Sequence, residues 1–77
     1  MLFLIEYDRP LGQIISLQTY PDSQLGEAGE VRLAMELRLQ SDGVEREVVI
    51  LDAASEDALR KTHRRYFESL QTLAKAG

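Results

Sequence analysis

The sequence predicts one small α+β domain, and three observations support this fold class. Two segments rich in β-forming residues, 2–8 and 13–20, are separated by a short turn-forming segment. A third such segment covers residues 45–52, and residues 55–75 follow with the periodicity of an amphipathic helix. Because chains divide into separate domains only well above a length of 77 residues, we expect a single domain over residues 1–77.

The first two β-rich segments are predicted to form a hairpin. Asp8 suits the opening of a turn, Pro10 fixes its own φ, and Gly12 permits a positive φ where the chain leaves the turn. The sequence therefore predicts an antiparallel pair of strands joined by a loop of four or five residues.

Residues 21–40 fit two structures. Apolar residues alternate with polar ones from Val31 to Leu39, which is the pattern of a strand, and the turn at residues 41–43 would then lead into a second hairpin. However, the segment is composed mostly of strong helix formers, and Gly43 suits the end of a helix. On a helix, one apolar stripe would consist of Leu25, Ala28, Val31, Met35 and Leu39. Leu33 and Leu37 would form a second stripe, beside or opposite the first.

The last two elements are a strand and a helix. Residues 45–52 are apolar on both faces in the middle, as in a buried strand. Ser55 is a suitable N-cap, and Glu56 and Asp57 would complement the positive end of the helix dipole. We expect this helix to continue to about Ala74.

The segment Thr62-His63-Arg64-Arg65-Tyr66-Phe67 has the pattern T-H-x-R-Y-F. It resembles the closing helix of a group of short, uncharacterised bacterial proteins, and residues 47–51 are similar to the strand before it. The resemblance implies a helix over residues 22–40, and it implies no activity.

With that helix the element order is ββαβα. A helical crossover is right-handed and leaves the second and third strands parallel. The first strand is the most apolar, so we place it in the centre of a three-stranded sheet of order 2-1-3, with both helices on one face. The alternative is a ββββα meander followed by the C-terminal helix.

Composition argues against several classes of function. Nine Lys and Arg against thirteen Asp and Glu give a net charge of −4, which makes general nucleic-acid binding unlikely. No cysteine and a single histidine leave no ligand set for a metal or a cofactor, and we expect neither. The apolar run at residues 1–5 is too short for a signal peptide or a membrane span, so we expect a cytoplasmic protein with no membrane partner.

His63 falls near the centre of the apolar arc of the last helix. A polar ring in such a position needs hydrogen-bond partners, so it is either a buried structural histidine or part of a site. The candidate ligand-binding residues are His63, Tyr66, Arg65, Glu6 and Tyr7. No nucleophile motif accompanies them, so we name no catalytic residue and do not expect an enzyme.

Four basic residues lie close together in this helix: Arg60, Lys61, Arg64 and Arg65. The hypothesis with the most support is a solvated helix face, because acidic residues stand at i,i+4 positions. A nucleic-acid contact through residues 60–65 is the alternative.

With both helices on one face, the other face of the sheet would expose apolar side chains. The candidate interface residues are Phe3, Ile5, Ile14, Val49 and Leu51. Because a contiguous apolar patch usually marks an interface, we expect a symmetric homodimer formed through this face or by pairing of edge strands. The sequence thus favours a small protein-interaction module that self-associates through its sheet over a small-ligand or enzymatic site around His63.

Overall fold

The computed structural model describes residues 1–67 and confirms the α+β fold class. The elements in chain order are β1 (Leu2–Asp8), β2 (Gln13–Tyr20), the 3₁₀ turn η1 (Asp22–Gln24), α1 (Leu25–Asp42), β3 (Glu47–Asp52), α2 (Glu56–Thr62) and the 3₁₀ turn η2 (Arg64–Tyr66). Because residues 25–42 are helical, the alternative four-stranded meander is wrong.

The sheet has the predicted order β2-β1-β3. β1 pairs antiparallel with both neighbours, so β2 and β3 run parallel to each other, as the crossover rule requires. The register with β2 shifts between Glu6, which pairs with Ser16, and Tyr7, which pairs with Ile14. Ile15 is therefore the extra residue of a β-bulge.

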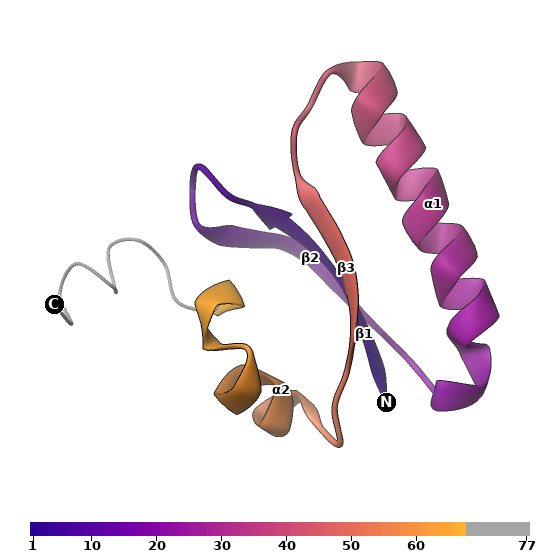
Figure 1. Cartoon of the computed structure of the whole chain (residues 1–77), viewed down its shortest axis with the longest axis vertical. Helices are drawn as coiled ribbons and strands as arrows, with labels where there is room; N and C mark the ends of the chain where they lie inside the picture. Colours follow the sequence, from indigo (N-terminus) through magenta and orange to yellow (C-terminus); the bar gives the residue numbers. More distant parts are fainter. Residues whose placement is uncertain (68–77) are drawn as a thin grey trace, which may run out of the picture.

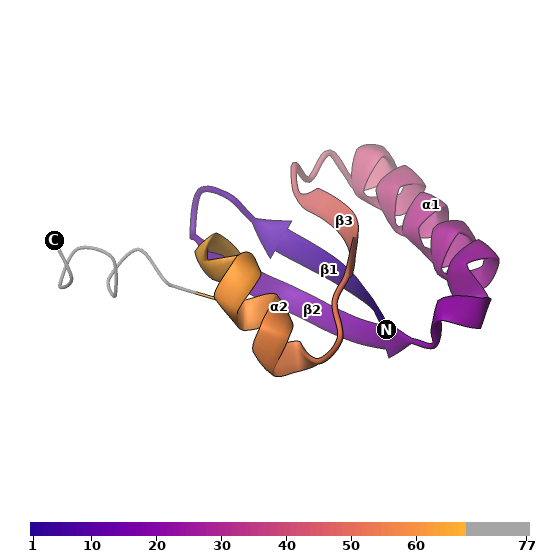
Figure 2. The ribbon, with the colours of Figure 1, turned by 60° about the horizontal axis from the view of Figure 1, so that its bottom comes forward.

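The two helices lie on opposite faces of the sheet, so the prediction that both cover one face is wrong (Figures 1 and 2). Successive side chains of a strand point to opposite faces, and β1 is apolar on both. Leu4 packs with α1, whereas Phe3 and Ile5 pack with α2. One helix on each face buries both apolar sides of β1, which two helices on a single face could not do.

Each face has its own core. On the α2 side the buried cluster is Phe3, Ile5, Tyr7, Leu59 and Tyr66. On the α1 side it is Leu4, Met35, Leu39 and Val48. The two clusters meet back to back through the central strand, and six of its seven residues are buried.

Helix α1 ends where the sequence predicts. Gly43 adopts φ 69°, and its N–H donates to the carbonyl oxygens of Leu39 and Gln40. The left-handed conformation favours glycine, and here it satisfies carbonyl groups at the end of the helix. The alternation of apolar and polar residues from Val31 to Leu39 does not form a strand. On the helix it places Leu39 toward the sheet and Leu33 and Leu37 toward the outside.

Helix α2 begins as predicted but ends early. The Ser55 hydroxyl oxygen accepts a hydrogen bond from the Ala58 N–H at 3.1 Å, which confirms the N-cap. The α-helix ends at Thr62, and His63 leaves helical geometry at φ −123° and ψ 53°. The expectation of a continuous helix to Ala74 is therefore wrong at His63, and residues 68–77 lie outside the described part of the chain.

Candidate protein-interaction surface

Three of the five predicted ligand-binding residues meet on the α2 side of the sheet. The rings of Tyr7 and Tyr66 pack edge to face with their centroids 5.0 Å apart. The Tyr7 hydroxyl donates to the backbone carbonyl oxygen of Arg65 at 3.2 Å. Glu6 does not join them, because it precedes Tyr7 in the strand and points to the opposite face.

Glu47 is the residue at the centre of this group, and the sequence analysis did not identify it. Its carboxylate accepts hydrogen bonds from the Tyr66 hydroxyl at 3.1 Å, from Arg65 at 3.2 Å and from Arg9 at 3.4 Å. Glu47 pairs with Tyr7 across the sheet, so a correct alignment of β1 with β3 would have placed it here.

The electrostatics of this group are those of a structural network. Burial raises the pKa of Glu47, but hydrogen bonds from Arg9 and Tyr66 and the charge of Arg65 outweigh burial and hold it below its ordinary value. Burial and the adjacent Glu47 raise the pKa of the Tyr66 hydroxyl. At neutral pH the phenol is protonated and the carboxylate is ionised, so their hydrogen bonds fasten η2 to the sheet.

His63 is half-buried and lies beside Tyr66, with the ring centroids 6.4 Å apart. The helix ends at this residue, so His63 does not occupy the centre of a core-facing stripe. Leu59 and Tyr66 take the core positions instead. The prediction of a central histidine depended on one continuous helix and is wrong for that reason.

Glu6 lies on the α1 side in a separate ionic group. It is 5% exposed, and its carboxylate is 2.5 Å from a terminal guanidinium nitrogen of Arg46. Arg46 Nε is buried 3.9 Å from Asp8 and has no hydrogen-bond partner within residues 1–67. This ion pair sits at the end of the sheet that holds the hairpin loop.

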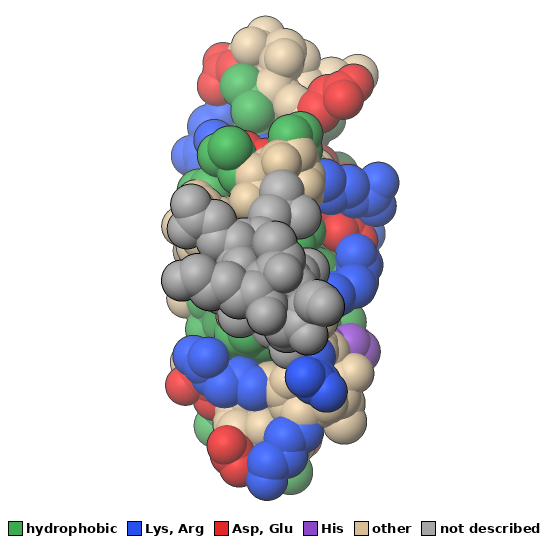
Figure 3. All heavy atoms as spheres, turned by 90° about the vertical axis from the view of Figure 1, so that its left-hand side faces the viewer, with side chains coloured by type: hydrophobic (Ala, Val, Ile, Leu, Met, Phe, Trp, Pro, Cys, Tyr) green, Lys and Arg blue, Asp and Glu red, His purple; other side chains and the backbone are tan. Residues whose placement is uncertain are grey.

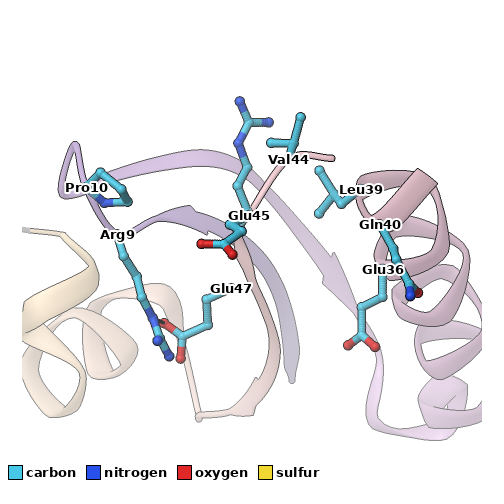
Figure 4. A pocket seen from close by; sticks show the side chains of 9 residues that line it. Arg9, Pro10, Glu36, Leu39, Gln40, Val44, Glu45 and Glu47 are labelled. Carbon is cyan, nitrogen blue, oxygen red and sulfur yellow. Dashed lines mark hydrogen bonds and ion pairs between the residues drawn. The ribbon is translucent and has the colours of Figure 1, made fainter. Parts of the chain in front are cut away.

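A depression of about 520 Å³ opens between the hairpin loop and the C-terminal end of α1 (Figure 4). Arg9 extends toward Glu47 on one side, while Glu36 and Gln40 project from α1 on the other. Arg9 and Glu47 bind each other, and Glu36 is paired with Arg32 at 2.8 Å. Among residues 1–67, Glu45 is the one charged residue of this lining without an ion pair, so the depression offers no available positive charge.

The basic residues of 60–65 are mostly paired with acidic neighbours. Arg60 binds Glu56 and also lies 4.5 Å from the centroid of the Phe67 ring. Lys61 binds Asp57, and Arg65 binds Glu47. Figure 3 shows blue basic and red acidic side chains next to each other on this side of the molecule. The arrangement is that of a solvated helix face with local ion pairs.

The predicted sheet interface lies under α2 and η2. Phe3 and Ile5 are fully buried, and Ile14, Val49 and Leu51 are partly buried against them. The expectation that this face is open is therefore wrong, because the second helix covers it. A homodimer would need another surface, because α2 and η2 occupy this one.

The outer side of α1 exposes two large apolar side chains. Leu33 and Leu37 are four residues apart near the middle of the helix, and each is 57% exposed. At 100° per residue they lie about 160° from Met35, which faces the sheet. We call Leu33 and Leu37 the outer leucine pair.

The surroundings of the outer leucine pair are open. Gly26 lies on the same side of α1, and a Cβ placed on Gly26 or Gly29 would meet no atom within 4 Å beyond the adjacent residues and the backbone of its own helix. Glycine in a helix destabilises it by about 1 kcal/mol relative to alanine, and no contact within residues 1–67 requires it here. The helix thus presents two exposed leucines next to an unobstructed backbone.

Comparisons with known proteins found no match to a family model, a curated protein or a solved structure. The likeness to bacterial proteins with the T-H-x-R-Y-F pattern therefore stays a prediction.

Within residues 1–67, no group of three or more potential metal ligands gathers. Neither helix in this range is long and apolar enough to cross a membrane.

Proposed function

We propose that this protein is an interaction module that forms a symmetric dimer through the outer leucine pair of α1. The observation that carries the proposal is the exposure of two neighbouring leucines on the side of the helix that faces away from the sheet. Large apolar side chains grouped in this way are typical of protein interfaces.

An antiparallel pair of α1 helices is the arrangement that we favour. If a two-fold axis passes level with Met35, Leu33 of one copy lies level with Leu37 of the other. The same register sets Glu30 level with Gln40 of the second copy, so that the amide can donate to the carboxylate. A parallel pair would instead bring Glu30 against Glu30 and align the two helix dipoles unfavourably.

The size of the helix limits the strength of this dimer. Eighteen residues make a helix about 27 Å long, and only its central part is apolar on the outside. A contact of this size belongs to the weak, transient class of interfaces. We therefore expect a dissociation constant of about 10–100 μM rather than an obligate dimer.

Sedimentation equilibrium over about 10 μM to 1 mM, a range that brackets this affinity, tests the proposal. The wild-type mass should rise from 8.7 kDa toward twice that value as concentration increases. The double variant Leu33→Glu/Leu37→Glu should stay monomeric at every concentration, because burying four carboxylates together is unfavourable.

Leu11→Glu is the matched control. Leu11 is 56% exposed, as the outer leucines are, but it lies in the hairpin loop. This variant should dimerise like the wild type, and circular dichroism should show that all variants fold. A wild-type protein that stays monomeric, or a double variant that still dimerises, would refute the proposal.

Cysteine cross-linking tests the orientation, since the natural chain has no cysteine. An oxidised mixture of Leu33→Cys and Leu37→Cys chains should form mainly mixed dimers if the helices are antiparallel. A parallel pair would form mainly like-with-like dimers.

A further inference from the structure

Strand β2 is an edge of the sheet with features that favour the addition of another strand. Its register with β1 is regular over the five residues 16–20, beyond the bulge at Ile15. None of its eight residues is charged or proline. Natural edge strands are usually protected by charges, proline or bulges, and the regular part of β2 has none of these.

A groove runs along this edge on the α1 side. Helix α1 packs mainly on β3 and β1. On the α1-facing side of β2, Tyr20 packs against the α1-side core and its hydroxyl donates to Gln18 at 2.7 Å, whereas Ser16 and Gln18 border open space. The space between helix and strand measures about 390 Å³. Its walls are Ser16 and Gln18 from β2, Glu6 from β1, and Val31, Ala34, Met35 and Arg38 from α1.

The groove combines an apolar wall with one available positive charge. Val31 and Ala34 offer apolar surface at one end, and Arg38 lies one to two helical turns further along. Within the described part of the chain Arg38 has no ion pair, whereas Glu6 is occupied by Arg46. The available charge at the groove is therefore positive and favours a carboxylate.

We propose that this groove binds an extended peptide segment of a partner protein, which adds to the sheet beside β2. Backbone hydrogen bonds to the free edge of residues 16–20 hold the segment, and its alternate side chains point into the groove. One of these is apolar and packs beside Ala34, and the other is acidic and binds Arg38.

The spacing of these residues sets the pattern of the ligand. Side chains on one face of a strand repeat every two residues, or about 6.7 Å. Ala34 and Arg38 are four residues apart on α1, or about 6 Å along its axis. The proposed segment runs antiparallel to β2, so it carries an apolar residue, any residue and then Asp or Glu.

Selection from a displayed library of random peptides of about eight residues, long enough to span β2, tests this pattern on the immobilised wild-type protein. The enriched peptides should share the apolar-x-acidic pattern. Enrichment of a different pattern, or no enrichment above the background on bare support, would overturn the proposal.

Two further measurements use the selected peptide, labelled with a fluorophore. Arg38→Gln should weaken binding about threefold to fivefold, as expected for an exposed ion pair. Arg32→Gln is the matched control, because Arg32 lies on the same helix but is paired with Glu36, and it should leave the affinity unchanged. Equal loss in the two variants would show that Arg38 has no specific role.

N-methylation of the peptide tests the addition of a strand directly. Alternate amides of a strand point to opposite edges, so only one of the two alternating sets bonds to β2. Methylating that set should weaken binding about tenfold or more, and methylating the other set should have little effect. Equal effects would indicate a ligand that binds without strand pairing.

This binding is independent of the dimer proposed above. The Leu33→Glu/Leu37→Glu variant should bind the peptide with wild-type affinity, because the outer leucine pair does not line the groove. A loss of binding in this variant would mean that the peptide needs the dimer or binds the outer leucines.

Discussion

The two faces of the sheet are covered by helices of very different length, and the difference indicates where partners bind. On one face, α2 has seven residues and buries Leu59 in an aromatic core, while its outer side carries ion pairs. On the other face, α1 has eighteen residues and is apolar on both its inner and outer sides. The short helix completes the fold, whereas the long helix also presents apolar surface to the outside.

Each face of the sheet also holds a largely buried glutamate, at the end of the sheet that carries the hairpin loop. Glu47, on the α2 side, has three hydrogen-bond donors from the hairpin loop and η2. Glu6, on the α1 side, depends on the single residue Arg46. Loss of one donor should therefore matter more for Glu6 than for Glu47.

The largest effect that we expect comes from the cores. Leu59→Ala should lower the free energy of unfolding by about 4 kcal/mol, because Leu59 is fully buried in the aromatic cluster. Leu39→Ala in α1 should lower it by about 2 kcal/mol, since Leu39 is 8% exposed at the edge of its cluster. Urea denaturation at one fixed protein concentration measures both losses. A larger loss for Leu39→Ala than for Leu59→Ala would contradict the expectation that the α2-side core contributes more to stability.

The next effect concerns the buried ion pair. Arg46→Met should destabilise the protein by about 3 kcal/mol, because it leaves the Glu6 carboxylate buried without its partner. The double variant Glu6→Met/Arg46→Met should regain most of this loss, since apolar side chains of similar size replace the whole pair.

The exposed pair Arg32–Glu36 provides the control for this test. Arg32→Met should change stability by about 0.5 kcal/mol or less. If Arg46→Met changes stability as little as Arg32→Met, the Glu6–Arg46 pair does not stabilise the α1 side.

The smallest effect is a pH dependence on the α2 side. The pKa of Glu47 is lower in the folded protein than its ordinary value of 4.5. Its ionised form therefore stabilises the fold above that value, and the stabilisation is lost as the pH falls through the lowered pKa.

Glu47→Gln should remove this contribution, with a loss of about 1 kcal/mol at neutral pH and a weaker decline of stability in acid. Glu45→Gln is the control, because Glu45 is exposed and lies two residues before Glu47, in the connection that leads into β3. Thermal denaturation from about pH 7 down to about pH 2 would show the difference. Identical acid profiles for the Glu47→Gln variant and the wild type would contradict the stabilising role of Glu47.

Much of the fold follows from local patterns in the sequence. The turn with Pro10 and Gly12 predicts the hairpin, and the apolar character of residues 2–8 predicts a central strand. Ser55 predicts the N-cap of α2, and Gly43 predicts the end of α1. Each of these depends on neighbouring residues alone.

The candidate site was less predictable. Tyr7, Arg65 and Tyr66 do come together. Glu47 joins them because it pairs across the sheet with Tyr7, which is 40 residues away in the sequence, and no local pattern predicts such a pairing. The predicted position of His63 in the core is wrong because α2 ends at Thr62. Tyr66 points toward the sheet instead and packs on Tyr7.

The sequence by itself determined the hairpin, the third strand, the start of α2, the end of α1 and the two apolar sides of both β1 and α1, but it left residues 21–40 open between strand and helix. Only the tertiary structure decided which face of the sheet each helix covers, and therefore which apolar residues remain exposed. The physical reason is that periodicity shows which side chains share a face, whereas the path of the chain determines what packs against that face. Phe3 and Ile5 became core in this way, and Leu33 and Leu37 became surface.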